Sequence, residues 1–483
     1  MRAIVEQIFR FGKEHAEKVA LLNGKVSMSY GDMLKGIIFA RDLLSDKYGL
    51  CKGDRIILAA NKQMEFASVY FACHLLEVIT LPIAPDTNIK RYELIKSKVN
   101  PKLVVGFPDD SKVVQIAELR EFEGKVEKIN FETITFPDLE SIADIIFTTG
   151  TTGEPKGVQL SHRNIAAAAR NINAFIKNKE SDVEMLALPI SHSFGLGRMR
   201  CVLSNGQTLV MLGSFANVKR FFRFMEEYGV NGFGMVPASW ALLKKLSGDA
   251  IGKYAGQLRY IEIGSAPMPM EEKRNLINLL PNTRICMHYG LTEASRSAFI
   301  EFHEETEHLN TVGKQSPNMH ITIRDEYGIE VSEEVEGEIC VEGDAVMAGY
   351  LDLAKSESFW GQSFRTGDWG TKNKNGYISL KSRKKELINV GGKKVSPIEV
   401  EDVIKTFEFV DDCICVGISD PDGILGEVVK AFIVTSHLDK VQFEVMDELI
   451  GNQLEGYKHP VAYERINEIP KTSSGKIQRL SLK

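Results

Sequence analysis

The stretch FTTGTTGEPKG, residues 147–157, places four threonines, three glycines and one lysine within eleven residues. Glycines allow the backbone to take positive φ and to turn N–H groups inward, while threonine hydroxyls add donors and Lys156 adds a positive charge. This composition is typical of a loop that binds a strongly anionic group. A Walker A loop is excluded, because it requires Ser or Thr directly after the lysine, where Gly157 stands. On composition alone, a solvated Gly/Thr turn stays open.

Strand-like runs stand on both sides of this loop. ADIIFTT, residues 143–149, and GVQLS, residues 157–161, have the pattern of strands, so we expect the loop to join two strands. Ser161 then serves as the N-cap of a helix over residues 161–175. Short strands alternate with helical patterns up to about residue 305, and this alternation predicts an α/β fold with parallel sheets.

The pattern changes twice further along the chain. After about residue 305, short strands with tight turns predict a small β-rich region. From about Glu386 the order β-α-β-β-α predicts a separate small α+β domain of ordinary size. We therefore expect a large N-terminal domain over residues 1–385, with parallel α/β layers and a small β-rich subdomain. A small mobile C-terminal domain is expected over residues 386–483.

Composition excludes several classes of protein. The chain has 483 residues, enough for two or three domains, and its formal net charge of -6 lacks the basic excess of a nucleic-acid binder. The N-terminus has no apolar core of a signal peptide. The most apolar window, residues 66–84, is interrupted by His74, Glu77 and Pro82, so it predicts a buried helix and a strand and no membrane span.

The seven cysteines show no CxxC pair and no Cys/His spacing suited to zinc. We expect reduced thiols packed in cores and, on that basis, a cytoplasmic protein. The oligomeric state stays open.

Four further motifs carry a resemblance to a known family. They are HYGLTEAS (residues 288–295), FRTGDWG (364–370), LKSRKKELINVGGKKVSPIEVE (380–401) and PKTSSGKIQR (470–479). Together with the opening loop they closely resemble, in the same order, the motifs of the adenylate-forming enzymes. That family includes acyl-CoA synthetases, aryl-CoA ligases, luciferases and the adenylation domains of peptide synthetases. The resemblance runs from about residue 27 to Arg479.

The resemblance implies a reaction in two steps. A carboxylic acid and ATP give an acyl-adenylate and pyrophosphate, and the acyl group then passes to a thiol. The implied cofactors are ATP, Mg²⁺ and CoA, with the phosphopantetheine of an acyl carrier protein as the alternative acceptor. A non-catalytic nucleotide-binding protein is the alternative from another class. It is disfavoured because Lys476 and Glu293, which are needed only for chemistry, are present.

The resemblance also assigns roles to residues. Lys476 would bridge the attacking carboxylate and the α-phosphate, Glu293 would hold Mg²⁺, and Thr292 would donate to the α-phosphate. Asp368 would accept both ribose hydroxyls, with Arg383 beside it. The full set expected to contact the nucleotide or the thiol arm is Thr148, Thr149, Gly150, Thr151, Thr152, Gly153, Lys156, Gly264, Ser265, Ala266, His288, Tyr289, Gly290, Asp368, Arg383, Gly391 and Gly392.

Two positions depart from the family pattern. Relatives commonly have Gln or Asn two residues before the tyrosine, where this chain has Met287, so adenine would be recognised by backbone groups and by stacking on Tyr289. The hinge residue, often Asp, is Lys385 here. The resemblance implies that the C-terminal domain swings about this residue, delivering Lys476 for adenylation and the Gly391-Gly392 loop for thiol transfer.

The acid is less well defined by the sequence. His192 resembles the family histidine near the carboxylate, and a packed structural histidine is the alternative. Ser193 and Phe194 follow it in place of the Asp that pairs an ammonium group, which disfavours an α-amino acid. The residues expected to line the acid pocket are small and apolar, so an apolar acyl or aryl acid is predicted.

Overall fold

The computed structural model describes residues 1–60, 64–107, 113–114, 129–149, 155–436, 443–451, 453–471 and 477–482. Five of the predicted site residues lie outside these ranges, as does the side chain of Thr149. The five are Gly150, Thr151, Thr152, Gly153 and Lys476.

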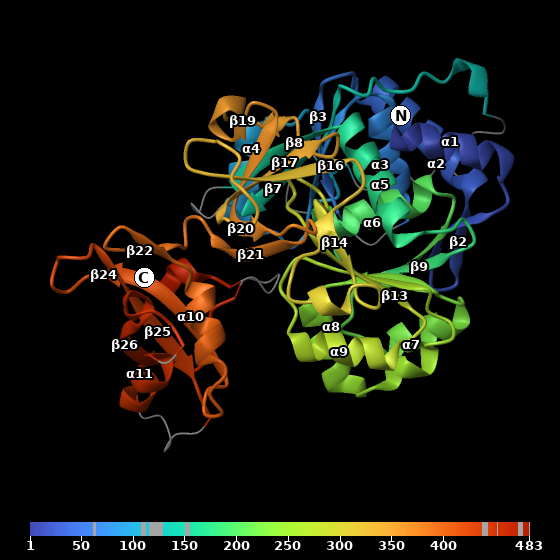
Figure 1. Ribbon diagram of the computed structural model, residues 1–483. Coiled ribbons are helices and arrows are strands. Elements are labelled where there is room, and N and C mark those ends of the chain that lie inside the picture. The colour runs from blue at the N-terminus through green and yellow to red at the C-terminus, as the bar shows by residue number, and fades with distance from the viewer. Residues whose placement is uncertain are drawn as a thin grey trace. The chain divides into compact units, whose positions relative to one another are not determined.

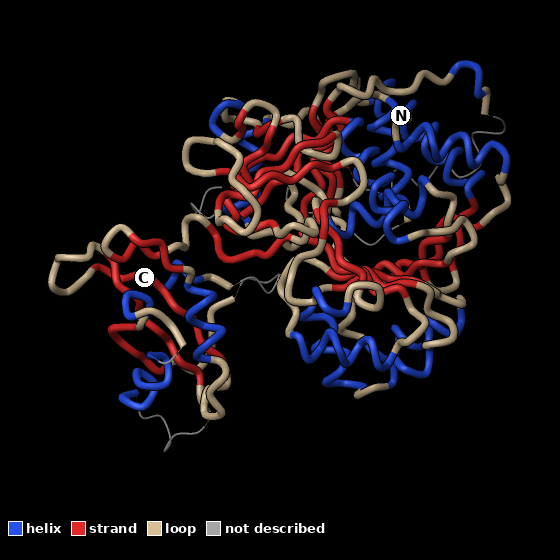
Figure 2. The backbone as a smooth tube through the Cα atoms, viewed as in Figure 1, coloured by secondary structure: helices blue, strands red, loops and turns tan. Residues whose placement is uncertain are grey.

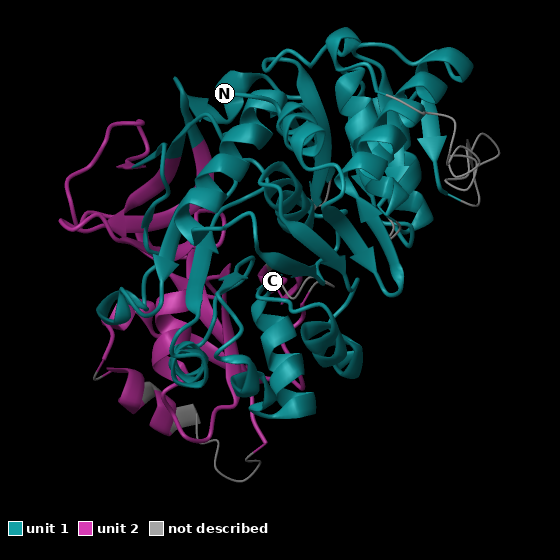
Figure 3. Cartoon of the chain, turned by 90° about the vertical axis from the view of Figure 1, so that its right-hand side faces the viewer, with its two compact units in different colours: residues 1–321, 341–364 teal, residues 322–340, 365–483 magenta. Residues whose placement is uncertain are grey.

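The chain divides into two compact units, which Figure 3 colours separately. Unit 1 comprises Met1–Ile321 and Val341–Phe364, and unit 2 comprises Thr322–Cys340 and Arg365–Lys483. The boundaries fall inside three strands, β16 (Met319–Arg324), β17 (Gly337–Gly343) and β20 (Ser363–Lys372). This division separates the chain into compact units, whereas the predicted boundary at residue 385 is a hinge about which one domain would move. The hinge boundary stays a prediction.

Unit 1 contains a nine-stranded mixed sheet in the order β15-β14-β13-β12-β11-β9-β10-β1-β2. Its middle strands are parallel, and β10, β11 and β12 are buried at every position, as expected for strands covered by helices on both faces. Antiparallel strands lie at both edges. The strands are β1 (Val19–Asn23), β2 (Val26–Ser29), β9 (Val183–Leu186), β10 (Thr208–Met211), β11 (Gly232–Met235), β12 (Tyr260–Ile263), β13 (Arg284–Tyr289), β14 (Ala298–Glu301) and β15 (Lys314–Gln315).

A second mixed sheet has seven strands in the order β18-β8-β7-β4-β3-β5-β6. The strands β4, β3, β5 and β6 are parallel to their neighbours, whereas β7 and β8 form an antiparallel hairpin that continues into β18. This hairpin confirms that the stretch at residues 147–157 joins two strands. The strands are β3 (Arg55–Ala59), β4 (Ile79–Ile83), β5 (Leu103–Val105), β6 (Val113–Val114), β7 (Ile142–Thr149), β8 (Pro155–Ser161) and β18 (Gly349–Tyr350).

Helices cover the nine-stranded sheet on both faces, with α7, α8 and α9 on one side and α6 on the other (Figures 1 and 2). Phe221 on α7, Trp240 on α8 and Leu276 on α9 pack against the sheet in one large apolar core. The helices of unit 1 are α1 (Ile4–Glu14), α2 (Tyr30–Asp42), α3 (Glu65–Leu75), α4 (Ile89–Val99), α5 (His162–Ile176), α6 (Ser193–Ser204), α7 (Val218–Glu227), α8 (Pro237–Ser247) and α9 (Met270–Leu279).

Local sequence signals set several of these helix starts. Ser161 caps α5 as predicted, and its side chain accepts a hydrogen bond from the backbone N–H of Asn164 in a reciprocal capping box. The apolar window at residues 66–84 forms α3 and β4, which confirms the predicted buried helix and strand. In the described part of the chain, no helix is long and apolar enough to cross a membrane.

Unit 2 ends in a small α+β domain, as predicted. The helices α10 (Pro397–Ile404) and α11 (Phe443–Gly451) pack on one face of the three-stranded sheet β24-β25-β26 through a core that includes Cys413 and Cys415. A five-stranded sheet has the order β16-β17-β20-β19, with β21 paired to β20. The strands not yet given are β19 (Phe359–Trp360), β21 (Ile378–Arg383), β22 (Ile388–Val390), β23 (Lys393–Val395), β24 (Asp412–Ser419), β25 (Glu427–Val434) and β26 (Pro460–Arg465).

The architecture is therefore an α/β fold with a large N-terminal domain of mixed sheets and a small C-terminal domain. Six of the seven cysteines are buried free thiols, as expected for thiols packed in cores. Cys51 differs, because it is exposed and its thiol donates to Asp54 at 3.3 Å.

Candidate active site

The lysine of the opening loop lies where β8 begins. Thr148 pairs with Lys156 across the β7–β8 hairpin, so the two residues stand at the closed end of the two strands. The Nζ atom of Lys156 lies 5.1 Å from the centre of the Tyr350 ring, within the range of a cation–π contact. The ammonium group of the loop is thus placed next to a residue nearly two hundred positions further along the chain.

Residues 346–351, which we name the bridging segment, connect the loop hairpin to the second motif. On one side the N–H of Leu351 donates to the carbonyl of Gly157 at 2.8 Å. On the other side the N–H of Met347 donates to the carbonyl of Glu293, also at 2.8 Å. No sequence motif marks this segment, because its composition, VMAGYL, is ordinary and only the strand pairing shows its position.

Glu293 is a buried carboxylate, 8% exposed, that accepts a hydrogen bond from the hydroxyl of Tyr350 at 2.8 Å. Among the described residues, no group of three or more His, Cys, Asp or Glu side chains could hold a metal ion. A single carboxylate fits Mg²⁺, which keeps several waters and takes further oxygen ligands from phosphates.

The turn that carries Thr292 and Glu293 has a tightly constrained backbone. A Cβ on Gly290 would lie 2.5 Å from the backbone nitrogen of Arg296, so only glycine fits there. Arg296 itself has φ +50, an unusual value for a residue with a side chain. The hydroxyl of Thr292 lies 3.1 Å from that of Ser193 at the start of α6.

Arg296 fastens this turn to α6. Its guanidinium donates to the carbonyls of Ser193 at 3.4 Å and Phe194 at 3.2 Å, and its Nε donates to the buried Glu262 at 3.0 Å. A Cβ on Gly197 would lie 2.8 Å from Arg296 Nη1, so a glycine in α6 makes room for the guanidinium. Sequence reasoning missed this arginine, since its partners are remote in the sequence.

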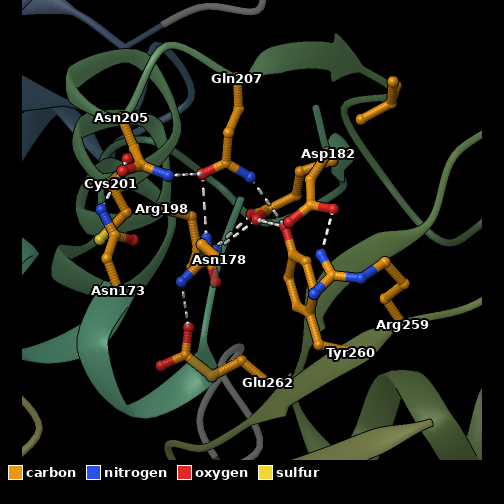
Figure 4. Close-up of polar contacts among 12 residues, drawn as sticks. Asn173, Asn178, Asp182, Arg198, Cys201, Asn205, Gln207, Arg259, Tyr260 and Glu262 are labelled. Carbon is orange, nitrogen blue, oxygen red and sulfur yellow. Dashed lines mark hydrogen bonds and ion pairs between the residues drawn. The ribbon is translucent and has the colours of Figure 1, made fainter. Parts of the chain in front are cut away.

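Glu262 is the centre of a wider buried ion network. It also accepts a hydrogen bond from Arg198 at 3.1 Å, and Figure 4 shows the two side chains pointing toward each other. Arg198 in turn is paired with Glu184. Burial raises the pKa of the Glu262 carboxyl, but Arg296, Arg198 and His288 outweigh burial and hold that pKa below its ordinary value.

The predicted nucleotide residues around this network lie at the ends of β12 and β13. The His288 Nδ1 atom is 2.8 Å from Glu262, and the ring fills the space where a Cβ on Gly264 would stand. Burial lowers the pKa of His288, although Glu262 acts in the opposite direction. Ser265 is exposed with φ +75, Ala266 beside it is half-buried, and Tyr289 ends β13 in a buried position.

His192 takes the N-cap position of α6, and its side chain is exposed and makes no capping hydrogen bond. It is therefore placed next to Ser193, the partner of Thr292. A small cavity of about 20 Å³ lies beside Ser193 and Thr292 and is walled on its other side by the apolar face of α5, including Ile165 and Ala169. That volume is close to the space one water molecule occupies.

A second buried carboxylate, Asp144, lies on β7 three residues before the loop stretch. It accepts hydrogen bonds from the hydroxyl of Tyr70 at 2.9 Å and from Thr80, and it is paired with Arg200. His74 Nε2 lies 3.3 Å from the same carboxylate. Sequence reasoning missed this cluster, because its five members come from four separate elements and share no motif.

Unit 2 carries the other predicted nucleotide residues. Asp368 and Arg383 face each other in the β20–β21 register, with Arg383 Nε 2.7 Å from the Asp368 carboxylate. Gly391 and Gly392 form the tight turn between β22 and β23, where φ values of +56 and +84 favour glycine. Lys385 is exposed just after β21.

A Thr/Gly loop with its lysine, a constrained Thr-Glu turn and a small C-terminal α+β domain on an α/β fold are the features of an adenylate-forming enzyme. Two family models match the chain, "AMP-binding enzyme" over residues 8–351 and "AMP-binding enzyme C-terminal domain" over residues 399–476. The chain belongs to the AMP-binding enzyme family and is an enzyme of the CoA ligase type.

Two curated relatives match over nearly the whole of both chains. A long-chain-fatty-acid–CoA ligase, FadD13 of Mycobacterium tuberculosis, is 28% identical over 95% of this chain and 93% of its own length. A 2-succinylbenzoate–CoA ligase of Staphylococcus epidermidis is 28% identical over 98% of this chain and 96% of its own. Among solved structures, o-succinylbenzoate CoA synthetase (MenE) of Bacillus subtilis, in complex with ATP and magnesium ion, has a TM-score of 0.85 at 23% identity, covering 99% of this chain and 98% of that one.

Proposed function

We propose that this enzyme activates a carboxylic acid with ATP to an acyl-adenylate, releases pyrophosphate, and transfers the acyl group to the thiol of CoA. The observation that carries this proposal is that Lys156 and Glu293 both contact one side chain, Lys156 at the ring of Tyr350 and Glu293 at its hydroxyl. A cationic group and a carboxylate suited to Mg²⁺ are thereby brought to one place, as the binding of a nucleoside triphosphate requires.

The chemistry sets what these residues do. A carboxylate that attacks an α-phosphate is one anion approaching another, so the site must neutralise charge and hold the reactants in line. Lys156 and the loop donors bind the β- and γ-phosphates, which leave as pyrophosphate. Thr292 donates to the α-phosphate, and the Ser193 hydroxyl, 3.1 Å from Thr292, helps to orient it.

The acid is proposed to be an apolar acyl or aryl acid. The relatives named above act on a long-chain fatty acid and on 2-succinylbenzoate at the same identity of 28%, so the comparison favours neither class of acid. The small cavity beside Thr292 is lined by small or apolar side chains such as Gly197 and Ile165, together with Arg200. The charge of Arg200 is paired with Asp144, so this lining supports an acid without a second charge.

The reaction is tested by ATP–pyrophosphate exchange across a panel of carboxylic acids. The expected result is exchange with at least one apolar acid, followed by thioester formation with CoA. Exchange followed by acylation of a carrier protein in place of CoA would reassign the acceptor. Absence of exchange with every acid would contradict the proposal and favour a nucleotide-binding protein without catalysis.

Lys476 separates the two half-reactions. Lys476→Ala should reduce adenylate formation by about a hundredfold or more, because a charge-stabilising donor is lost at the α-phosphate. Thioester formation from supplied acyl-adenylate should be unchanged. The matched control is Lys471→Ala, an exposed lysine five residues earlier on the same segment. Equal loss in both half-reactions would show that the C-terminal domain does not work in two poses.

A further inference from the structure

Tyr350 contacts both charged groups of the proposed triphosphate site. Its hydroxyl donates to Glu293 Oε1 at 2.8 Å, and its ring lies 5.1 Å from Lys156 Nζ. We infer that Tyr350 is the positioning residue of this site, with the hydroxyl orienting the metal-binding carboxylate and the ring holding the loop lysine. This inference rests on the proposed function and concerns how the same site binds Mg²⁺ and ATP.

The hydroxyl acts on the direction of the carboxylate. Glu293 is buried, and a donor on one of its oxygens fixes the rotation of the carboxylate plane, which the side chain alone would leave free. Groups that orient a metal ligand are worth about ten- to a hundredfold in metal affinity. Removing the hydroxyl should therefore change the affinity for Mg²⁺ and leave the affinity for the metal-free nucleotide as it is.

The ring acts on the lysine. A lysine ammonium on a four-carbon stem has many rotamers, and contact with an aromatic face restricts them. In the structure this contact holds the ammonium at the start of β8, where the loop ends. When phosphate binds, the ammonium has only to turn from the ring to an anion, so the ring lowers the ordering cost of that contact.

The backbone of Tyr350 is fixed independently of its side chain. Tyr350 pairs with Val158 across the β18–β8 ladder, and its carbonyl accepts a hydrogen bond from the side-chain amide of Gln159 at 3.0 Å. The next residue, Leu351, donates its N–H to Gly157. Substitution of the ring or the hydroxyl should therefore leave the bridging segment in place, which makes the two side-chain roles separable by mutation.

The experiment measures ATP binding to the full chain by isothermal titration calorimetry at a series of Mg²⁺ concentrations. Tyr350→Phe removes the hydroxyl and keeps the ring, and Tyr350→Leu removes both. Tyr327→Phe is the matched control, since Tyr327 is 76% exposed on a turn. The melting temperature is recorded for each variant.

For Tyr350→Phe, the Mg²⁺ concentration that half-saturates the effect on ATP binding should rise about tenfold, with the metal-free Kd and the melting temperature unchanged. Tyr350→Leu should in addition weaken metal-free ATP binding about two- to fivefold. In a Glu293→Gln background, Tyr350→Phe should have no further effect, because the hydroxyl acts through that carboxylate.

Two results would overturn the inference while the proposed function stands. One is wild-type Mg²⁺ dependence in Tyr350→Phe. The other is a Tyr350→Phe variant whose affinity for metal-free ATP and whose melting temperature fall together with its Mg²⁺ affinity, which would indicate a general structural role. A wild-type chain that fails to bind ATP at any Mg²⁺ concentration would overturn the proposed function and this inference with it.

Discussion

Asp144 and Glu262 are two fully buried carboxylates with different surroundings. Glu262 faces two arginines and a histidine. One of the arginines, Arg296, stands at the end of the turn that bears Thr292 and Glu293, and its guanidinium also donates to the carbonyl of Ser193. Asp144 faces one arginine, Arg200, and one histidine, His74, together with two hydroxyl donors, and it lies three residues upstream of the loop stretch on β7.

The difference concerns what each carboxylate holds. Through Arg296, the Glu262 network fixes a functional turn by hydrogen bonds to the backbone of α6. The Asp144 cluster joins α3, β4, β7 and α6 within the core and ends before the loop begins. The turn with Thr292 and Glu293 is therefore held in place by buried ion pairs. The loop with Lys156 is instead positioned by the β7–β8 hairpin and by the bridging segment.

The largest effect is expected for Glu262→Gln. It leaves Arg198 and Arg296 buried without their shared countercharge, and breaking a buried pair in this way costs about 3–5 kcal/mol. Urea unfolding should show that loss, and ATP binding should weaken as the 290–296 turn loosens. Glu227→Gln, at an exposed position, is the control and should match wild type. A stable Glu262→Gln variant with normal ATP affinity would remove the proposed link between the network and the turn.

Asp144→Asn should lower the free energy of unfolding by less, about 1.5–3 kcal/mol. Only one guanidinium, that of Arg200, is left without its countercharge, and the amide oxygen still accepts hydrogen bonds. Burial raises the pKa of the Asp144 carboxyl, but Arg200, His74 and Thr80 outweigh burial, so the carboxyl is ionised at neutral pH. ATP affinity should change little, in contrast to Glu262→Gln. Equal effects of the two substitutions on ATP affinity would contradict the distinction between the two regions.

The smallest effect concerns pH. Burial lowers the pKa of His162 from the ordinary 6.5 to about 2, so this histidine stays neutral in the folded state. Burial also lowers the pKa of His74, although Asp144 acts in the opposite direction. Below pH 6.5 the unfolded chain binds protons that the folded chain does not. The free energy of unfolding should therefore fall with decreasing pH, by at most about 1.4 kcal/mol per pH unit for each histidine.

His162→Leu tests this pH dependence directly. Neither ring nitrogen of His162 has a hydrogen-bond partner among the described residues, so an apolar replacement leaves no donor or acceptor unpaired. The slope of the unfolding free energy against pH, measured by urea unfolding between pH 6.5 and pH 5, should decrease by the contribution of one histidine, at most about 1.4 kcal/mol per pH unit. His320→Gln, an exposed position, should keep the wild-type slope. An unchanged slope in His162→Leu would show that His162 does not contribute.

Much of the fold followed from local sequence signals. The helix cap at Ser161, the hairpin around the loop, and the buried helix and strand in residues 66–84 were all predicted correctly, because each depends on residues a few positions apart. The edge strands that make the sheets mixed were not predicted, since short antiparallel pairs such as β14 and β15 have too few residues to show a period.

The family and the residue types of the candidate site were determined by the sequence alone. Lys156, Thr292 and Glu293 are recognisable because chemistry requires a cation, a hydroxyl and a carboxylate in fixed local motifs. The contacts that orient them were decided by the tertiary structure. Tyr350 reaches Glu293 across 57 positions, and Arg296 reaches Glu262 across 34. Such pairs form only when sheet register brings distant strands together, and the burial that then strengthens them is absent from any local stretch of sequence.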